Sequence, residues 1–184
     1  MTKETITYNE EKLAELILYI GEQTRDDETF GATKMNKTLF FADFLHYAAT
    51  GRPITGAEYQ KLPFGSAPRR LLPVRRQLIA NDAATYDRSS YLGRFSVKRL
   101  LPKRGANMSM FNETETRFVD EVLALISDGT ATSASDLSHR EVGWQLAQEG
   151  ETIPYETVWL SYEEPTASDR RRARVLAEKF NIAA

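Results

Sequence analysis

The sequence predicts a mainly α-helical fold, a single compact helical domain with one small antiparallel β element. Three observations support this class: an amphipathic helical segment near the N-terminus, a densely apolar helical segment after it, and one β-like stretch in the middle of the chain. With 184 residues, 41% of them hydrophobic, the chain can bury a core and has the size of one domain. We therefore expect residues 1–184 to form a single domain.

The clearest helical periodicity lies in residues 9–23. Its apolar side chains recur at intervals of three and four residues: Leu13, Leu16, Ile17 and Ile20. This spacing is typical of an amphipathic helix that packs one face on a core.

A second helix is expected from a cap at Thr33 to about Thr50, with Gly51 as its C-terminal stop. Apolar side chains occupy nearly all its sides, so we expect it to be the central helix. In residues 52–68, glycine and proline favour a turn, a short extended piece and another turn. A helix is expected to follow towards Asn81, kinked by Pro73 or regular only from there.

Residues 85–91 and 94–100, separated by Leu92 and Gly93, favour a hairpin and carry the main β signal. Asn112 and Glu115 have the spacing of a capping pair and predict the start of another helix. Ser138 and Glu141 repeat this spacing before a short helix through Gln148. A last helix is expected over residues 168–179.

The composition limits where the protein works and how it is held together. The chain has no cysteine, which excludes disulfides, thiolate metal sites and a cysteine nucleophile. The N-terminal residues lack the pattern of a signal peptide, and no long apolar run follows. We therefore expect a cytoplasmic protein that is neither secreted nor inserted in a membrane.

Charge is distributed unevenly along the chain. Residues 61–104 contain eleven Lys or Arg and two Asp, a net charge of +9, so the remainder carries −11 of the overall −2. Such a block can bind nucleic acid or an acidic protein, or it can pair with the acidic parts of its own fold. Tyr86 and Tyr91 alternate with Arg88 and Arg94, a pattern compatible with single-stranded nucleic acid or with a hairpin covering a core.

Residues able to perform catalysis are few. Asp43 and His46 lie three residues apart on one helix face, and with His139 they could form a metal site or an acid–base pair. The alternative is that they satisfy buried polar groups within an apolar helix, and this is the interpretation we prefer. No catalytic or phosphate-binding motif supports the first reading. We therefore predict no enzymatic activity, no catalytic residue, no metal and no cofactor.

The string TKMNKTLFFADFLHYAATGRPITGAEYQKLPFGSAPRR, residues 33–70, closely resembles the signature of the SocA-like antitoxin family, the Panacea domain. A second block, with His139, Trp144 and the Ile153–Pro154 pair, resembles the family's C-terminal half. The similarity covers about residues 9–160. Phe40 replaces the usual Tyr, and Ser66–Ala67 replace the usual Pro-Val before Pro68, which bears on the geometry of that turn.

The resemblance implies an antitoxin of a toxin–antitoxin pair, from a bacterium or a phage, that neutralises its toxin by direct protein–protein contact. It leaves two routes open. The antitoxin covers the working surface of the toxin, or it acts as a proteolytic adaptor that delivers the toxin to an ATP-dependent protease. The alternative from another class is a nucleic-acid-binding regulator that uses the basic block 61–104, although we do not expect nucleic acid to be a partner.

Arginine is favoured over lysine at protein interfaces because its planar group forms paired hydrogen bonds and stacks. We therefore expect part of the toxin-binding surface to come from the basic block and its hairpin. The candidates are Arg69, Arg70, Arg75, Arg76, Tyr86, Arg94 and Arg99. Six signature residues are expected to hold the fold together instead: Lys37, Asp43, His46, Tyr59, His139 and Trp144.

Overall fold

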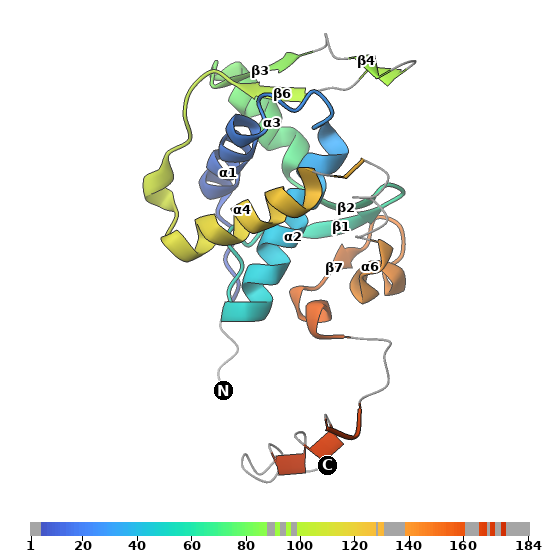
Figure 1. The fold of residues 1–184 in the computed structure, drawn as a ribbon. Helices are drawn as coiled ribbons and strands as arrows, with labels where there is room; N and C mark the ends of the chain where they lie inside the picture. Colours follow the sequence, from blue (N-terminus) through green and yellow to red (C-terminus); the bar gives the residue numbers. More distant parts are fainter. Residues whose placement is uncertain are drawn as a thin grey trace.

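The computed structural model is organised around three helices whose apolar faces meet in one core (Figure 1). α2 (Ala32–Thr50) packs against both α1 (Glu10–Gln23) and α4 (Glu113–Ser127). With its small antiparallel sheets, this arrangement confirms the predicted mainly α-helical class. The structure describes residues 5–87, 91–92, 95–96, 99–127, 129–130, 139–160, 166–168, 170–171 and 174–175.

α1 confirms the amphipathic helix expected in residues 9–23. Asn9 occupies the N-cap position, and its side chain accepts a hydrogen bond from the backbone N–H of Lys12 at 2.9 Å. Glu10 and Glu11 in the first turn complement the partial positive charge of the helix N-terminus. The predicted apolar face is fully buried.

α2 is buried on most of its circumference, as its apolar composition predicts. The expected cap at Thr33 is wrong, because the helix begins at Ala32 and Gly31 takes the N-cap position. The C-terminal stop is confirmed. Gly51 has a left-handed φ of +78°, and its N–H donates to the carbonyl of Tyr47.

Residues 52–68 contain a β-hairpin, which adds a β element to the one predicted. β1 (Tyr59–Leu62) pairs antiparallel with β2 (Gly65–Pro68). On its other edge β1 pairs with β7 (Thr152–Ile153), which places Ile153 opposite Tyr59. Strands this short show no alternating pattern, and β7 comes from a distant part of the chain, so local sequence signals did not reveal the sheet.

The expected helix after Pro68 is α3 (Leu71–Ala80). Pro73 lies in its first turn, where backbone N–H groups have no partner within the helix, so no kink is needed. The predicted hairpin follows and is confirmed by two strand pairs. Leu92 pairs with Phe95 and so belongs to a strand instead of the turn. The strands are β3 (Ala84–Asp87), β4 (Tyr91–Leu92), β5 (Phe95–Ser96) and β6 (Arg99–Pro102).

The capping pair before α4 is confirmed in both directions. The N–H of Asn112 donates to Glu115 Oε2 at 3.0 Å, and the N–H of Glu115 donates to Asn112 Oδ1 at 2.9 Å. The helix expected to open at Ser138 begins later in the chain. The short helix α6 (Val142–Leu146) has Glu141 itself as N-cap, and Ser138 lies outside the described residues.

Two 3₁₀ turns complete the described fold, η1 (Met108–Met110) and η2 (Tyr155–Trp159). Most of the helix expected over 168–179 falls outside the described residues. Within the part of the chain that is described, no helix is both long and apolar enough to cross a bilayer.

Gly143 marks a tight contact between α6 and η2. A Cβ atom there would lie 2.2 Å from Thr157 Oγ1 and 2.8 Å from Ile153 Cγ2. We expect Gly143→Ala to lower the free energy of unfolding by about 1–3 kcal/mol, because the overlap pushes α6 away from η2 and β7. Urea denaturation checks this, with Gly105→Ala as the control because its nearest neighbour would be 4.0 Å away. Equal losses in the two variants would contradict the prediction.

Candidate partner-binding surface

The signature residue Asp43 is the centre of a buried polar network. Its side chain is fully inaccessible and accepts from the Thr55 N–H at 2.7 Å and the Thr55 hydroxyl at 2.5 Å. Two tyrosine hydroxyls reach the same carboxyl group, Tyr59 at 2.7 Å and Tyr155 at 3.3 Å. The network therefore joins α2, the loop before β1, β1 itself and η2.

A count of hydroxyl protons bears on the charge of Asp43. The Tyr59 hydroxyl also lies 2.8 Å from the Leu39 carbonyl, and the Tyr155 hydroxyl lies 2.7 Å from the Ala57 carbonyl. Each tyrosine has one proton and a carbonyl can only accept, so four contacts share two tyrosine protons, and a protonated Asp43 supplies a third. Burial raises the pKa of Asp43, against the opposing hydrogen bonds of Thr55, Tyr59 and Tyr155, and favours the same neutral form.

Two further signature residues on α2 also face inward. His46 Nδ1 lies 2.6 Å from the Arg52 carbonyl, so this nitrogen carries the proton and ties the helix end to the following loop. Lys37 is 1% exposed, and its amine donates to the Ser66 carbonyl at 3.3 Å. Burial lowers the pKa of Lys37 to about 7.

The C-terminal signature residues attach α6 to the sheet. The rings of His139 and Trp144 stack with centroids 4.1 Å apart, and the amine of Lys61 lies 4.1 Å from the Trp144 ring centroid. Lys61 also donates to the Ala147 carbonyl at 3.0 Å. This cation–π contact connects β1 to α6.

The metal site considered for Asp43, His46 and His139 is not assembled in this structure. Asp43 and His46 bind different parts of the loop before β1, and His139 stacks on Trp144. Among the described residues, no group of three or more metal-ligating side chains gathers.

Two of the arginines expected on a binding surface are buried, which corrects that expectation. Arg75 is 4% exposed, and its guanidinium lies 5.2 Å from the ring centroid of the half-buried Tyr86. Arg99 is 6% exposed, donates to the Thr24 and Arg25 carbonyls and forms an ion pair with Asp87. Both guanidinium groups bind within the protein.

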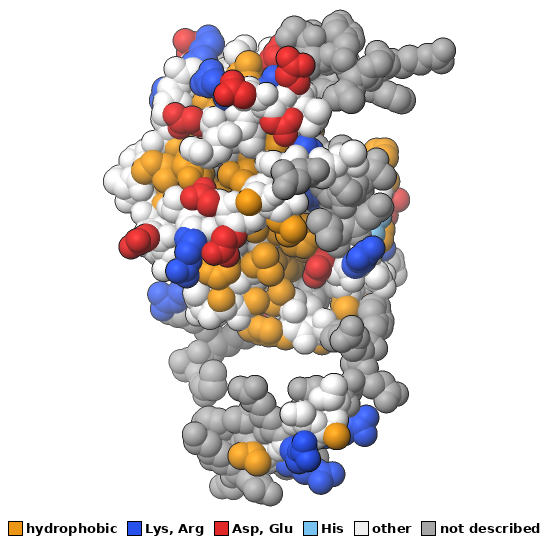
Figure 2. All heavy atoms as spheres, in the orientation of Figure 1, with side chains coloured by type: hydrophobic (Ala, Val, Ile, Leu, Met, Phe, Trp, Pro, Cys, Tyr) orange, Lys and Arg blue, Asp and Glu red, His pale blue; other side chains and the backbone are white. Residues whose placement is uncertain are grey.

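Other charges of the basic block also have partners within the protein. Arg70 donates twice to Glu10, and Arg104 donates twice to Glu15. Lys103 pairs with Asp82. On the main body shown in the upper part of Figure 2, basic side chains are interspersed with acidic ones. The internal-pairing interpretation of the block therefore applies to these residues.

Arg69 is exposed but connects three strands. Its guanidinium donates to Gln60 Oε1, to Thr152 Oγ1 and to the Gly150 carbonyl, at 2.6–3.2 Å. Arg94 lies outside the described residues. Of the predicted arginines, Arg76 combines exposure with a guanidinium for which the described structure shows no bound partner.

A candidate surface lies on the outer side of α3. Leu72 is 58% exposed, and Arg76 follows it four residues later on the same side of the helix. An exposed leucine beside an unpaired arginine has the composition of a protein-contact surface. We call the pair Leu72 and Arg76 the α3 patch.

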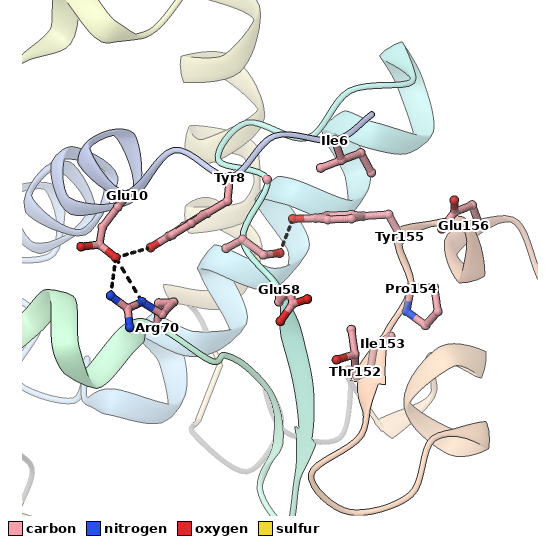
Figure 3. A pocket seen from close by; sticks show the side chains of 12 residues that line it. Ile6, Tyr8, Glu10, Glu58, Arg70, Thr152, Ile153, Pro154, Tyr155 and Glu156 are labelled. Carbon is pink, nitrogen blue, oxygen red and sulfur yellow. Dashed lines mark hydrogen bonds and ion pairs between the residues drawn. The ribbon is translucent and has the colours of Figure 1, made fainter. Parts of the chain in front are cut away.

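A groove with a volume of about 660 Å³ lies near the start of α3. Figure 3 shows the side chains that line it. One wall is the N-terminal segment with Ile6 and Tyr8, and the other is the β7 segment with Ile153 and Pro154. The hydrogen-bonded pair Arg70 and Glu10 stands at one end. Tyr8 also donates to Glu10 at 3.3 Å, and burial with the nearby Glu10 charge raises the pKa of Tyr8 to about 12.

The family model described as "Antitoxin SocA-like, Panacea domain" matches residues 35–145, more than half of the chain. The chain belongs to this antitoxin family. No curated protein and no solved structure gives a significant match.

The matched part of the Panacea domain contains all six signature residues, and the structure places them in scaffold contacts. Tyr155, which the sequence analysis did not single out, completes the Asp43 network from outside the matched range. Its signal was weak, a single tyrosine after the Ile153–Pro154 pair. Its role follows only from the tertiary structure, which packs η2 against α2.

Proposed function

We propose that this SocA-like protein is the antitoxin of a toxin–antitoxin pair and neutralises its toxin by direct protein contact. The observation that carries the proposal is membership of an antitoxin family over residues 35–145. The signature residues are occupied in scaffold contacts, which leaves partner binding to exposed surfaces. Such a rigid scaffold with variable exposed surfaces suits partners of different kinds.

The proposed toxin contact includes the α3 patch, with Arg69 and Arg70 at its N-terminal border. Leu72 can enter an apolar pocket of the partner, and Arg76 can pair with a carboxylate there. Tyr86 is half-buried against Arg75 and contributes at most its exposed edge.

The double variant Leu72→Asp with Arg76→Glu is expected to weaken toxin binding about tenfold or more, because it removes an apolar anchor and reverses a charge. The product of the neighbouring gene is the probe, and isothermal titration calorimetry measures its affinity. Leu125→Asp with Arg117→Glu on α4 is the matched control, since both side chains are more than half exposed. Equal weakening by both pairs would argue against the α3 patch, and a wild-type protein that binds no such product would argue against the antitoxin function.

Two routes of neutralisation follow from this proposal, occlusion of the toxin and its delivery to an ATP-dependent protease. They differ in the lifetime of the toxin. Under occlusion, the antitoxin leaves the rate of toxin turnover unchanged or lowers it. Delivery requires faster turnover when the antitoxin is present, and a pulse–chase experiment in cells with and without protease distinguishes the routes.

The nucleic-acid alternative draws less support from the same surface. Arg75 and Arg99 are buried, and Arg70, Lys103 and Arg104 are paired with carboxylates, so few charges of the basic block are available for phosphates. Fluorescence anisotropy with labelled DNA and RNA at increasing salt tests this. A steep fall of affinity with salt would favour the alternative.

A further inference from the structure

A second groove lies beside the one in Figure 3 and shares Glu10 with it. It has a volume of about 460 Å³ and runs between α1 and α3, with Ala14, Val74 and Leu78 in its lining. The ion pair of Glu10 and Arg70, with an Nη2–Oε2 distance of 2.9 Å, therefore stands where the two grooves meet. We call the two together the Glu10 double groove.

Carboxylates outnumber cations around the double groove. The first groove has Glu10, Glu58 and Glu156 in its lining, and the second adds Glu11 and Glu15. The cations in the two linings are Arg70 and Arg104, and both are already held by Glu10 and Glu15. The double groove is therefore acidic, although it lies next to the basic block.

Two of these carboxylates are exposed and have at most a weak ion pair within the protein. Glu58 has a side chain 69% exposed, and its closest cation is Arg69 Nε at 3.7 Å, a distance and exposure at which an ion pair contributes little. Glu11 is exposed in the first turn of α1. Both can accept hydrogen bonds from an incoming cation.

Apolar side chains contribute to the lining of the first groove, among them Ile6, Ala57 and Ile153. Ala57 and Ile153 are buried in the protein core. A lysine or arginine side chain matches such a site, because its aliphatic stem packs on apolar surface while its charged end reaches the carboxylates of the lining.

We propose that the Glu10 double groove binds a segment of the toxin that carries lysine or arginine side chains. This inference rests on the proposed antitoxin function and names the chemistry of the partner. Charge complementarity supports this, because Glu11 and the weakly paired Glu58 line two adjoining grooves whose volumes suit several side chains. The toxin then contacts α3 from both sides, with its own acidic and apolar groups on the α3 patch and its basic segment in the grooves.

The test is Glu11→Lys combined with Glu58→Lys in the full chain, with the product of the neighbouring gene as the probe. We expect affinity to fall about tenfold or more and the association rate to lose part of its salt dependence. The matched control is Glu121→Lys combined with Glu149→Lys, which changes the net charge equally at two exposed positions that line neither groove. Thermal unfolding of each variant verifies that it is folded.

A selective loss in the groove variant, with the control changed less than about threefold, supports the proposal. Equal losses in both variants would show a general effect of net charge and overturn it. Unchanged affinity in the groove variant would also overturn it while leaving the antitoxin function intact. If the wild-type protein fails to bind the probe, the result contradicts both the groove proposal and the antitoxin function.

Discussion

Replacing Asp43 by alanine is expected to lower the free energy of unfolding by about 3–5 kcal/mol. The substitution leaves the Thr55 N–H without its acceptor, removes a partner of the Tyr59 and Tyr155 hydroxyls, and opens a cavity in a region with no access to solvent. Because Asp43 joins four elements, the loss affects the whole core. Urea denaturation followed by circular dichroism measures it.

Asp43→Asn separates the charge of this residue from its hydrogen bonds. If the carboxyl group is neutral, as burial and the proton count favour, the amide replaces it with a smaller loss than alanine. Asp120→Ala is the control, because Asp120 accepts a 2.7 Å hydrogen bond from Tyr19 at an exposed position. A loss in Asp43→Ala no larger than in this control would refute the central role of the network.

Replacing Lys37 by methionine is expected to stabilise the protein at pH 6, by about 2 kcal/mol, because a buried amine gives way to an apolar side chain of similar shape. In the native protein the pKa of Lys37 falls from its ordinary 10.5 to about 7 through burial. Between these values the unfolded chain binds more protons than the folded one. The wild-type free energy of unfolding therefore rises with pH across this window, by at most about 1.4 kcal/mol per pH unit.

The methionine variant lacks the pH-dependent contribution of Lys37 to the free energy of unfolding. Its extra stability over wild type should therefore shrink as the pH rises from 7 towards 10. Urea denaturation of both proteins at several pH values measures the difference. Lys34→Met is the control on the same helix. The Lys34 amine is equally buried but donates to Asp27, Thr29 and the Ser127 carbonyl. Losing this amine should therefore destabilise the protein. A pH-independent difference between wild type and Lys37→Met would contradict the prediction.

The local elements followed from the sequence because their signals act within a few residues. Asn9 caps α1, Gly51 ends α2, and Asn112 with Glu115 opens α4, each through contacts no more than four residues apart. The missed elements depend on distant partners. β7 exists because β1, about 90 residues earlier in the chain, offers it an edge.

The candidate site was less predictable, since the sequence could count arginines but could not show their partners. Arg75 and Arg76 are neighbours in the chain, yet one is buried against Tyr86 and the other is exposed on α3. Their helix positions differ by about 100°, so the packing side of α3 decides which of them a partner can reach.

By itself, the sequence determined the mainly α-helical class, the positions of several helix ends and the family, through a signature whose residues make contacts within the scaffold. Only the tertiary structure decided which charges remain available. Arg70 pairs with Glu10 and Arg104 with Glu15, residues 60 and 89 positions apart, and Glu11 and the weakly paired Glu58 then remain available around the double groove. The physical reason is that capping and periodicity are local, whereas burial and ion pairing depend on which distant segments the core brings together.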